Sequence, residues 1–198
     1  MSLGHAGEPS LLDRLIGKTC TLVVESRRTN LALARFLVSG ASSGCFVLDL
    51  DGLYSSNAER LLQGIPQSLL ENVRIMLPEP GSNVESDLST VIGSSAKLVI
   101  IDSLNTLNHL LSVGGRSARG RKLTFFMEAI AVFARLNQTA VIFTMYARER
   151  TTSLPSGRAL NTVSDAEVTA QTKEGKVRLI CERGNLWKPG LLTIPSDF

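Results

Sequence analysis

Three aspartates follow apolar runs that are typical of buried strands. Asp49 and Asp51 lie in the segment CFVLDLDGLY, and Asp102 ends the segment KLVIID. Ligands of parallel α/β sheets bind beyond the carboxyl ends of the strands, where a carboxylate can hold Mg²⁺ or its water shell. The simpler interpretation is that the three carboxylates cap turns or pair with Arg27 and Arg28. We favour that interpretation, because clustered carboxylates without a bound cation repel one another.

The run Leu98–Asp102 has the form of a Walker B strand. Four apolar residues followed by aspartate also occur by chance in many α/β proteins. In that case Asp102 caps the following turn through Ser103 and Leu104.

The segment after the first predicted strand lacks a normal phosphate-binding loop. Such a loop has the pattern GxxxxGK[ST], because its glycines let successive N–H groups face the phosphates and its lysine reaches the β and γ groups. The strand ends at Val24 and we expect the next helix to start near Asn30, which leaves no glycine and only Glu25, Ser26, Arg27, Arg28 and Thr29. We therefore predict a degenerate Walker A motif, no nucleotide cofactor and no ATPase activity.

Hydrophobic periodicity predicts strands that alternate with helices, followed by a β-rich tail. Asn30 is the expected cap of the first long helix and Gly40 its stop. The expected strands are 19–24, 45–50, 73–77, 97–101 and 139–145, and the further helices are 58–63, 84–92 and 123–136. Short runs at 167–171, 176–181 and 191–194 follow. We expect an α/β fold with a mostly parallel central sheet, flanking helices and antiparallel C-terminal strands.

In order and spacing, these segments resemble the ATPase core of the RecA/RadA recombinase superfamily, in particular archaeal RadA and RadB paralogues. The resemblance runs from about Ser10 to Ile194, and its most specific part is DLDGLY with the later Glu59-Arg60. It implies a RecA-like core in which three residues match family positions: Asp102 the Walker B aspartate, Asp51 the acid that orients the attacking water, and Thr144 the polar sensor.

Basic residues gather in two segments that contain Gly and Ser, Ser112–Lys122 and Tyr146–Thr162. The resemblance implies that these are the first and second DNA-binding loops. We expect flexible, cationic loops that contact phosphates, since stacking aromatics are scarce. Alternatively, they are solvated connections whose charges aid solubility. The predicted DNA-binding residues are Arg116, Arg119, Arg121, Lys122, Arg148, Arg150 and Arg158.

The length of 198 residues fits one domain. From the resemblance we expect a single RecA-like core domain over residues 1–198, with a short extension at residues 1–9 and no separate N-terminal helical domain. Neither a membrane span nor a secretory signal is evident, so we expect a cytoplasmic protein. A net charge of +3 does not by itself identify a nucleic-acid binder. The three cysteines form no CxxC pair, which favours small core residues over a metal site; they are Cys20, Cys45 and Cys181.

Together these features predict a non-catalytic recombinase paralogue that assists homologous recombination and DNA repair. Its expected partners are single-stranded DNA and a RecA-family recombinase or another paralogue, in a homo- or hetero-oligomer. Two alternatives stay open: a divergent ATPase half-site that completes a partner's nucleotide pocket, and a KaiC-like signalling or scaffold module. Trp187 is either an anchor for a partner or a cover for the end of the sheet.

Overall fold

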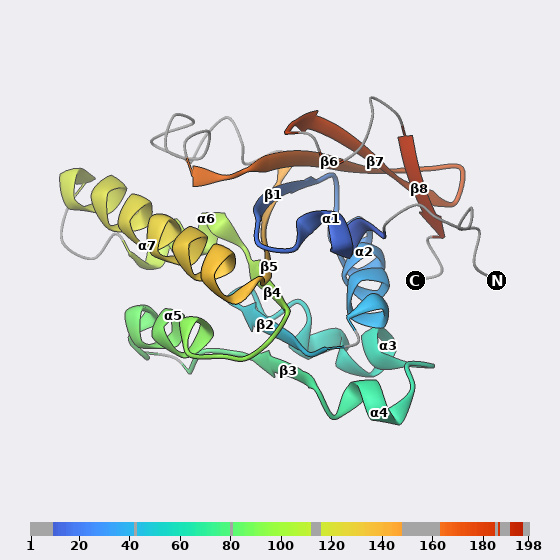
Figure 1. Ribbon diagram of the computed structural model, residues 1–198, viewed down its shortest axis with the longest axis horizontal. Helices are drawn as coiled ribbons and strands as arrows, with labels where there is room; N and C mark the ends of the chain where they lie inside the picture. Colours follow the sequence, from blue (N-terminus) through green and yellow to red (C-terminus); the bar gives the residue numbers. More distant parts are fainter. Residues whose placement is uncertain are drawn as a thin grey trace.

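The computed structural model describes residues 10–41, 43–79, 81–111, 116–147, 163–184, 186 and 191–195. All eight described strands join one sheet in the order β3-β2-β4-β5-β1-β6-β7-β8. Figure 1 shows the sheet with helices on both sides. The strands are β1 Thr19–Val24, β2 Cys45–Asp49, β3 Val73–Met76, β4 Leu98–Asp102, β5 Ala140–Tyr146, β6 Ala166–Lys173, β7 Lys176–Arg183 and β8 Leu191–Pro195.

The helices connect the parallel strands. They are α1 Leu11–Leu15, α2 Arg27–Gly40, α3 Ala58–Leu62, α4 Gln67–Leu70, α5 Val84–Ile92, α6 Leu104–Leu110 and α7 Arg116–Asn137, with a 3-10 turn at Ser55–Asn57. Pairing is parallel from β3 through β6, whereas β7 and β8 are antiparallel to their neighbours. The predicted fold class, a mostly parallel sheet with antiparallel C-terminal strands, is confirmed.

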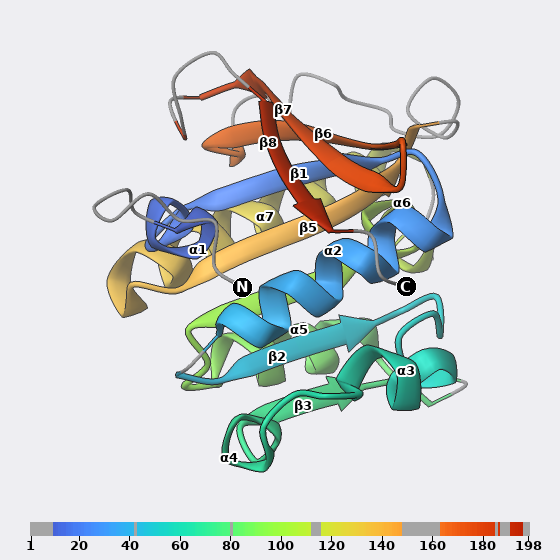
Figure 2. The ribbon, with the colours of Figure 1, turned by 90° about the vertical axis from the view of Figure 1, so that its right-hand side faces the viewer.

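The central strands are buried on both faces, which explains why their sequences are apolar without alternation. Their side chains divide the core into two clusters. One cluster packs under α1, α2 and α3, and the other packs under α5, α6 and α7. Figure 2 shows α2 lying in front of the sheet. This two-sided cover leaves the ends of the strands as the place where polar side chains can gather.

The C-terminal strands require one close backbone approach. Gly184 has φ +90°, and a Cβ at this position would lie 2.6 Å from the carbonyl oxygen of Asp165. Glycine is therefore needed just after β7, where the chain passes the start of β6.

The predicted strands and the four predicted helices are confirmed in their order along the chain, with three corrections. First, the short helices α1, α4 and α6 had not been predicted. Second, α2 begins at Arg27 and is capped by Ser26, so Asn30 is not the cap. Third, α7 begins at Arg116, whereas we had predicted a flexible segment up to Lys122. The three short helices span only four to seven residues, too few to produce a clear helical period. The starts of α2 and α7 are polar, so the apolar pattern placed both starts too late.

Several smaller expectations bear on the core. Cys20 and Cys45 are buried as predicted, while Cys181 is only half-buried.

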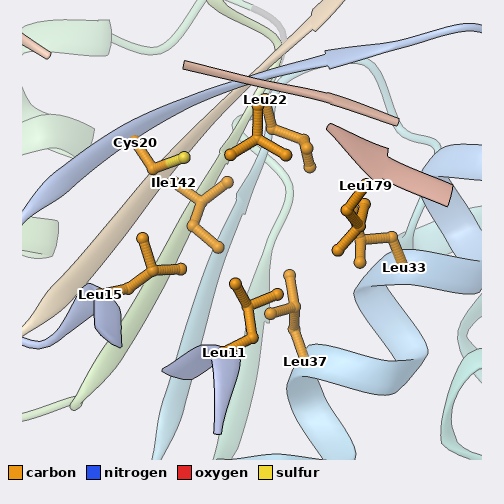
Figure 3. Close-up of a pocket in the computed structure, with 9 residues that line it drawn as sticks. Leu11, Leu15, Cys20, Leu22, Leu33, Leu37, Ile142 and Leu179 are labelled. Atoms are coloured by element: carbon orange, nitrogen blue, oxygen red, sulfur yellow. The ribbon is translucent and has the colours of Figure 1, made fainter. Parts of the chain in front are cut away.

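No described helix combines the length and hydropathy needed to cross a membrane. Figure 3 shows a small apolar pocket between α1, α2 and the sheet. Its lining is entirely apolar and comprises Leu11, Leu15, Cys20, Leu22, Leu33, Leu37, Ile142, Val168 and Leu179.

Candidate functional site

Two aspartates lie side by side at the carboxyl ends of neighbouring strands. Asp49 ends β2, Asp102 ends β4, and the two are directly paired in the parallel register. Both side chains are fully buried. From β5, the Thr144 hydroxyl donates a short hydrogen bond to Oδ1 of Asp102. The sequence had placed Thr144 near a polar sensor position, and the structure indeed brings it to the strand-end aspartate.

The connection between β1 and α2 consists of Glu25 and Ser26 alone, because α2 begins at Arg27. Ser26 caps the helix, and its Oγ accepts a hydrogen bond from the backbone N–H of Thr29 at 3.2 Å. That N–H is one of the donors that a helix N-terminus can offer to a phosphate. The connection is therefore shorter than predicted. The Ser26 side chain already occupies one of the backbone N–H groups at the start of α2.

The neighbouring strand β6 holds the same connection in place. A carboxylate oxygen of Glu25 accepts a hydrogen bond from the backbone N–H of Thr172 at 3.0 Å. The hydroxyls of Thr29 and Thr172 are 2.8 Å apart. These contacts tie the connection and the first turn of α2 to the end of β6. The connection cannot widen into a loop without losing them.

Asn30 is the centre of the polar network at this edge of the sheet. It lies in the first turns of α2 and is 1% exposed. Its Nδ2 donates to Oδ1 of Asp102 at 2.9 Å and to the hydroxyl of Tyr146 at 3.4 Å. Its Oδ1 accepts from the hydroxyl of Tyr54 at 2.8 Å. One amide thereby links α2, β4, β5 and the segment after β2.

Burial dominates the electrostatics of this network. It raises the pKa of Asp102 to about 7, although the hydrogen bonds from Thr144 and Asn30 lower it, and Asp51 and Asp49 add to the rise. Burial likewise raises the pKa of Tyr146 to about 12 and lifts the pKa of Tyr54 well above its ordinary value. Near neutral pH, both tyrosines are therefore neutral hydrogen-bond donors and Asp102 is close to its midpoint of protonation.

The other two aspartates accept hydrogen bonds from a turn and from a helix, respectively. One oxygen of Asp49 accepts a hydrogen bond from the backbone N–H of Ser55 at 2.6 Å. Asp51 is exposed and accepts a short hydrogen bond from the Thr106 hydroxyl at the start of α6. The predicted capping is thus confirmed for Asp49, whereas Asp102 bonds to side chains of other elements instead of the turn that follows it.

The predicted pairing of these aspartates with Arg27 and Arg28 was wrong. Both arginines lie in the first turn of α2 with exposed side chains, and the ion pairs among the described residues involve neither. The reason is the early start of α2, which moves both residues from a loop onto the helix.

The residues at this edge do not fit a magnesium-nucleotide complex bound in the manner of a Walker A loop. Such a loop needs a six-residue, glycine-containing arc before its lysine, and the connection here has two residues and no glycine. Oδ1 of Asp102 is held by Asn30 and Thr144. Among the described residues, no three His, Cys, Asp or Glu side chains are grouped as metal ligands.

Two buried oxygens at the site lack a protein partner among the described residues. They are Oδ1 of Asp49 and Oδ2 of Asp102. An unpaired buried carboxylate oxygen disfavours the charged form. Protonation of Asp102 is the simplest compensation, in agreement with its raised pKa.

The predicted DNA-binding residues divide into two groups. Arg116, Arg119, Arg121 and Lys122 lie in the first turns of α7. In Figure 1 these turns extend beyond α5 and α6. The Nζ of Lys122 is 2.9 Å from a carboxylate oxygen of Glu85. The side chains of the three arginines lie outside the described part of the structure, as do Arg148, Arg150, Arg158 and Trp187.

Sequence reasoning missed the role of three site residues. The sequence predicts Asn30 as a helix cap, Tyr54 only as part of a family motif and Tyr146 as the start of a loop. In the structure, Tyr146 instead ends β5. A signal for Asn30 was present: it is polar and opens the otherwise apolar run LALA of the first long helix. A buried amide at that position requires partners.

Comparison with known proteins supports the fold. No protein-family model matches the sequence, and neither does any curated protein. Among solved structures, the crystal structure of the RadB recombinase is similar with a TM-score of 0.67 and 16% sequence identity, over 91% of this chain and 88% of that one. At this identity the match establishes the fold. The chain therefore has the RecA-like core fold of the RadA/RadB type that its motifs predict.

Proposed function

We propose that the chain is a non-catalytic RecA-like protein that assists homologous recombination by binding single-stranded DNA, a recombinase partner, or both. The observation that carries the proposal is the bond between Asn30 and Asp102. In an active core of this fold, the corresponding region lies around the nucleotide phosphates and Mg²⁺. Here an internal network of Asn30, Tyr54, Thr144 and Tyr146 surrounds the aspartate.

The loss of hydrolysis follows from the missing loop. Phosphoryl transfer depends on positioned amides, a cation and a metal ion that stabilise charge on the phosphates. The connection of Glu25 and Ser26 offers no glycine-rich arc, and Glu25 adds a negative charge close to the place where phosphates would bind. Arg28 could pair with a phosphate as a single cation, but one ion pair does not replace the cradle of amides.

A role in recombination is supported by the fold. The similar solved protein is described as a RadB recombinase, and its likeness extends over nearly the whole of this chain. A RecA-like core without nucleotide chemistry keeps only binding surfaces. We infer that these surfaces serve DNA or a catalytically active recombinase.

DNA binding is supported by the charge at the start of α7. The first turns carry Arg116, Arg119, Arg121 and Lys122, and the first turn has no acidic residue. Basic residues are unfavourable there, since the helix dipole makes the N-terminus positive. An anionic ligand offsets this cost, and the phosphates of a single strand supply such charge without sequence preference.

The test is retention of a fluorescent single-stranded oligonucleotide at low salt, with and without a RecA-family recombinase. Changing Arg116, Arg119 and Arg121 to Ala should weaken binding strongly. Arg74→Ala is the matched control, because Arg74 is an exposed arginine on β3, and it should leave binding unchanged. If the chain alone does not retain the oligonucleotide and also forms no complex with the recombinase, the proposal is contradicted. Indifference to DNA together with a stable complex of another kind favours a scaffold function instead.

A further inference from the structure

Helix α7 has a second apolar face that the other described residues of the chain leave exposed. Phe125, Val132 and Leu136 are 65%, 52% and 79% exposed, and Ala129 between them is partly exposed. Their spacing of four, three and four residues places all four side chains in one narrow stripe along the helix. We name this stripe the outer face of α7.

The opposite side of the helix is already used by the fold. Leu123, Met127, Ile130 and Ala134 are buried in the core cluster between α7 and the sheet. A helix that covers a sheet normally has one apolar stripe and one polar face. Apolar residues on two opposite faces indicate that both are buried in the working form of the protein, because exposed apolar stripes mark interaction sites.

One residue of the outer face is held in position by the core. The ring of Phe125 packs edge to face on the ring of Phe126, with centroids 5.5 Å apart, and Phe126 itself packs against the buried cluster. The exposed ring is therefore oriented before any partner arrives, which lowers the entropy lost on binding.

The outer face is complementary to itself. When two copies of α7 cross in antiparallel orientation midway between Ile130 and Ala131, Phe125 of each copy lies opposite Leu136 of the other. Ala129 then lies opposite Val132 close to the crossing, where the small side chain lets the helices approach. Such a two-fold arrangement uses the same patch twice, as closed dimers do.

The charged residues beside the stripe also favour a second copy of this chain as the partner. Glu128 and Arg135 flank the stripe on the same side, with opposite charges, and both are exposed. In an antiparallel pair of helices, residues on corresponding flanks face each other. Glu128 of one copy therefore faces Arg135 of the other, twice per dimer, and a parallel pair does not produce this match. Arg135 also contacts Asp165 at 3.3 Å within its own chain, which steadies the guanidinium.

We propose that the outer face of α7 is the interface of a two-fold symmetric dimer of this chain. The proposal rests on helix geometry and charge and is independent of DNA binding and of the proposed function. The dimer carries the basic first turns of both α7 helices, one at each end of the antiparallel pair.

The test is the molar mass of the full chain by light scattering across the micromolar range. The wild type should approach twice the 21.4 kDa of one chain as concentration rises. Val132→Glu places two carboxylates near the two-fold axis and should raise the dissociation constant at least about tenfold. Leu77→Glu is the matched control, since Leu77 is 53% exposed outside α7, and its dimer should persist.

A charge exchange separates this interface from simple loss of folding. Glu128→Arg and Arg135→Glu should each weaken the dimer, and the variant with both changes should regain affinity, because the pair is restored with reversed signs. A wild type that stays monomeric at every concentration overturns the proposal. The proposal is also overturned if Val132→Glu leaves the dissociation constant unchanged, or if the variant with both charge changes does not regain affinity.

Discussion

The amide of Asn30 donates a hydrogen bond to Oδ1 of Asp102 across 2.9 Å, although the two residues are 72 positions apart in the chain. This bond joins the start of α2 to the end of β4, the two elements that bracket the nucleotide in active cores of the RecA-like fold. Asp102 thereby becomes part of an internal network that stabilises the fold.

Replacing Asn30 by Asp should destabilise the protein strongly and with a clear dependence on pH. The change keeps the size of the side chain but places a second buried carboxyl beside Asp102. At alkaline pH the loss of unfolding free energy should be about 3–5 kcal/mol, the cost of an uncompensated buried charge. Denaturant unfolding measures it. Asn83→Asp is the control, because Asn83 is the exposed cap of α5 and aspartate caps equally well. Equal effects of the two changes would contradict the role given to Asn30.

Asp102 should make the stability of the wild type fall as pH rises from about 4 to about 7. Its pKa is about 7 in the folded chain and 3.8 in the reference state, so the folded state binds the extra proton in this window. The stabilisation is complete below the unfolded pKa and lost as pH passes the folded one, with a slope of at most about 1.4 kcal/mol per pH unit. The variant Asp102→Asn cannot titrate there. The unfolding free energy of this variant, measured beside the wild type, should not show the decrease between about pH 4 and about pH 7 that Asp102 causes. Parallel pH profiles of the two proteins would contradict the raised pKa of Asp102.

Leu33→Ala should cost about 2–5 kcal/mol of unfolding free energy, because it removes buried apolar atoms and enlarges the small apolar pocket of Figure 3. Leu77→Ala removes the same atoms from a side chain that is largely exposed and should cost less than about 0.5 kcal/mol. Chemical denaturation of both variants checks the difference. A similar cost for the two would mean that the pocket is not part of the folded core.

Arg28→Lys should not create nucleotide binding. The substitution restores the residue type of the Walker A lysine, but the connection of Glu25 and Ser26 still lacks the amides of a longer arc. Titration with a fluorescent ATP analogue should give the same flat response as the wild type. A saturable response would show that the missing lysine, and not the missing arc, limits binding.

Binding of single-stranded DNA should weaken steeply with salt. Each phosphate contact contributes a slope of about −0.7 to the logarithm of affinity against the logarithm of salt concentration. Changing Arg116, Arg119 and Arg121 to Ala should therefore reduce the slope by roughly 2 if all three contact phosphates. Fluorescence anisotropy at several salt concentrations measures it, and an unchanged slope would place the DNA elsewhere.

Much of the fold was predictable because parallel strands leave a strong signal. The runs TCTLVV, CFVLD and LVIID are buried on both faces, so apolar continuity located them almost to the residue. Helix starts were harder to locate, since they depend on single capping hydrogen bonds. Ser26, and not Asn30, caps α2, and that shift of four residues changed the interpretation of the whole connection.

The site was predictable in part. The sequence located Asp49 and Asp102 at strand ends, because each follows an apolar run, and the family resemblance pointed to Thr144 near the end of β5. It did not reveal what surrounds Asp102, since Asn30, Tyr54 and Tyr146 come from three distant segments that only the packing of α2 on the sheet brings together.

The most direct test is a calorimetric titration of the purified chain with ATP in the presence of Mg²⁺, alone and with a recombinase partner. If the network around Asn30 and Asp102 has replaced the nucleotide, the chain alone should give no saturable heat. The recombinase's own binding of ATP should be the same with and without the chain. A saturable heat of ATP binding to the chain alone would contradict the account.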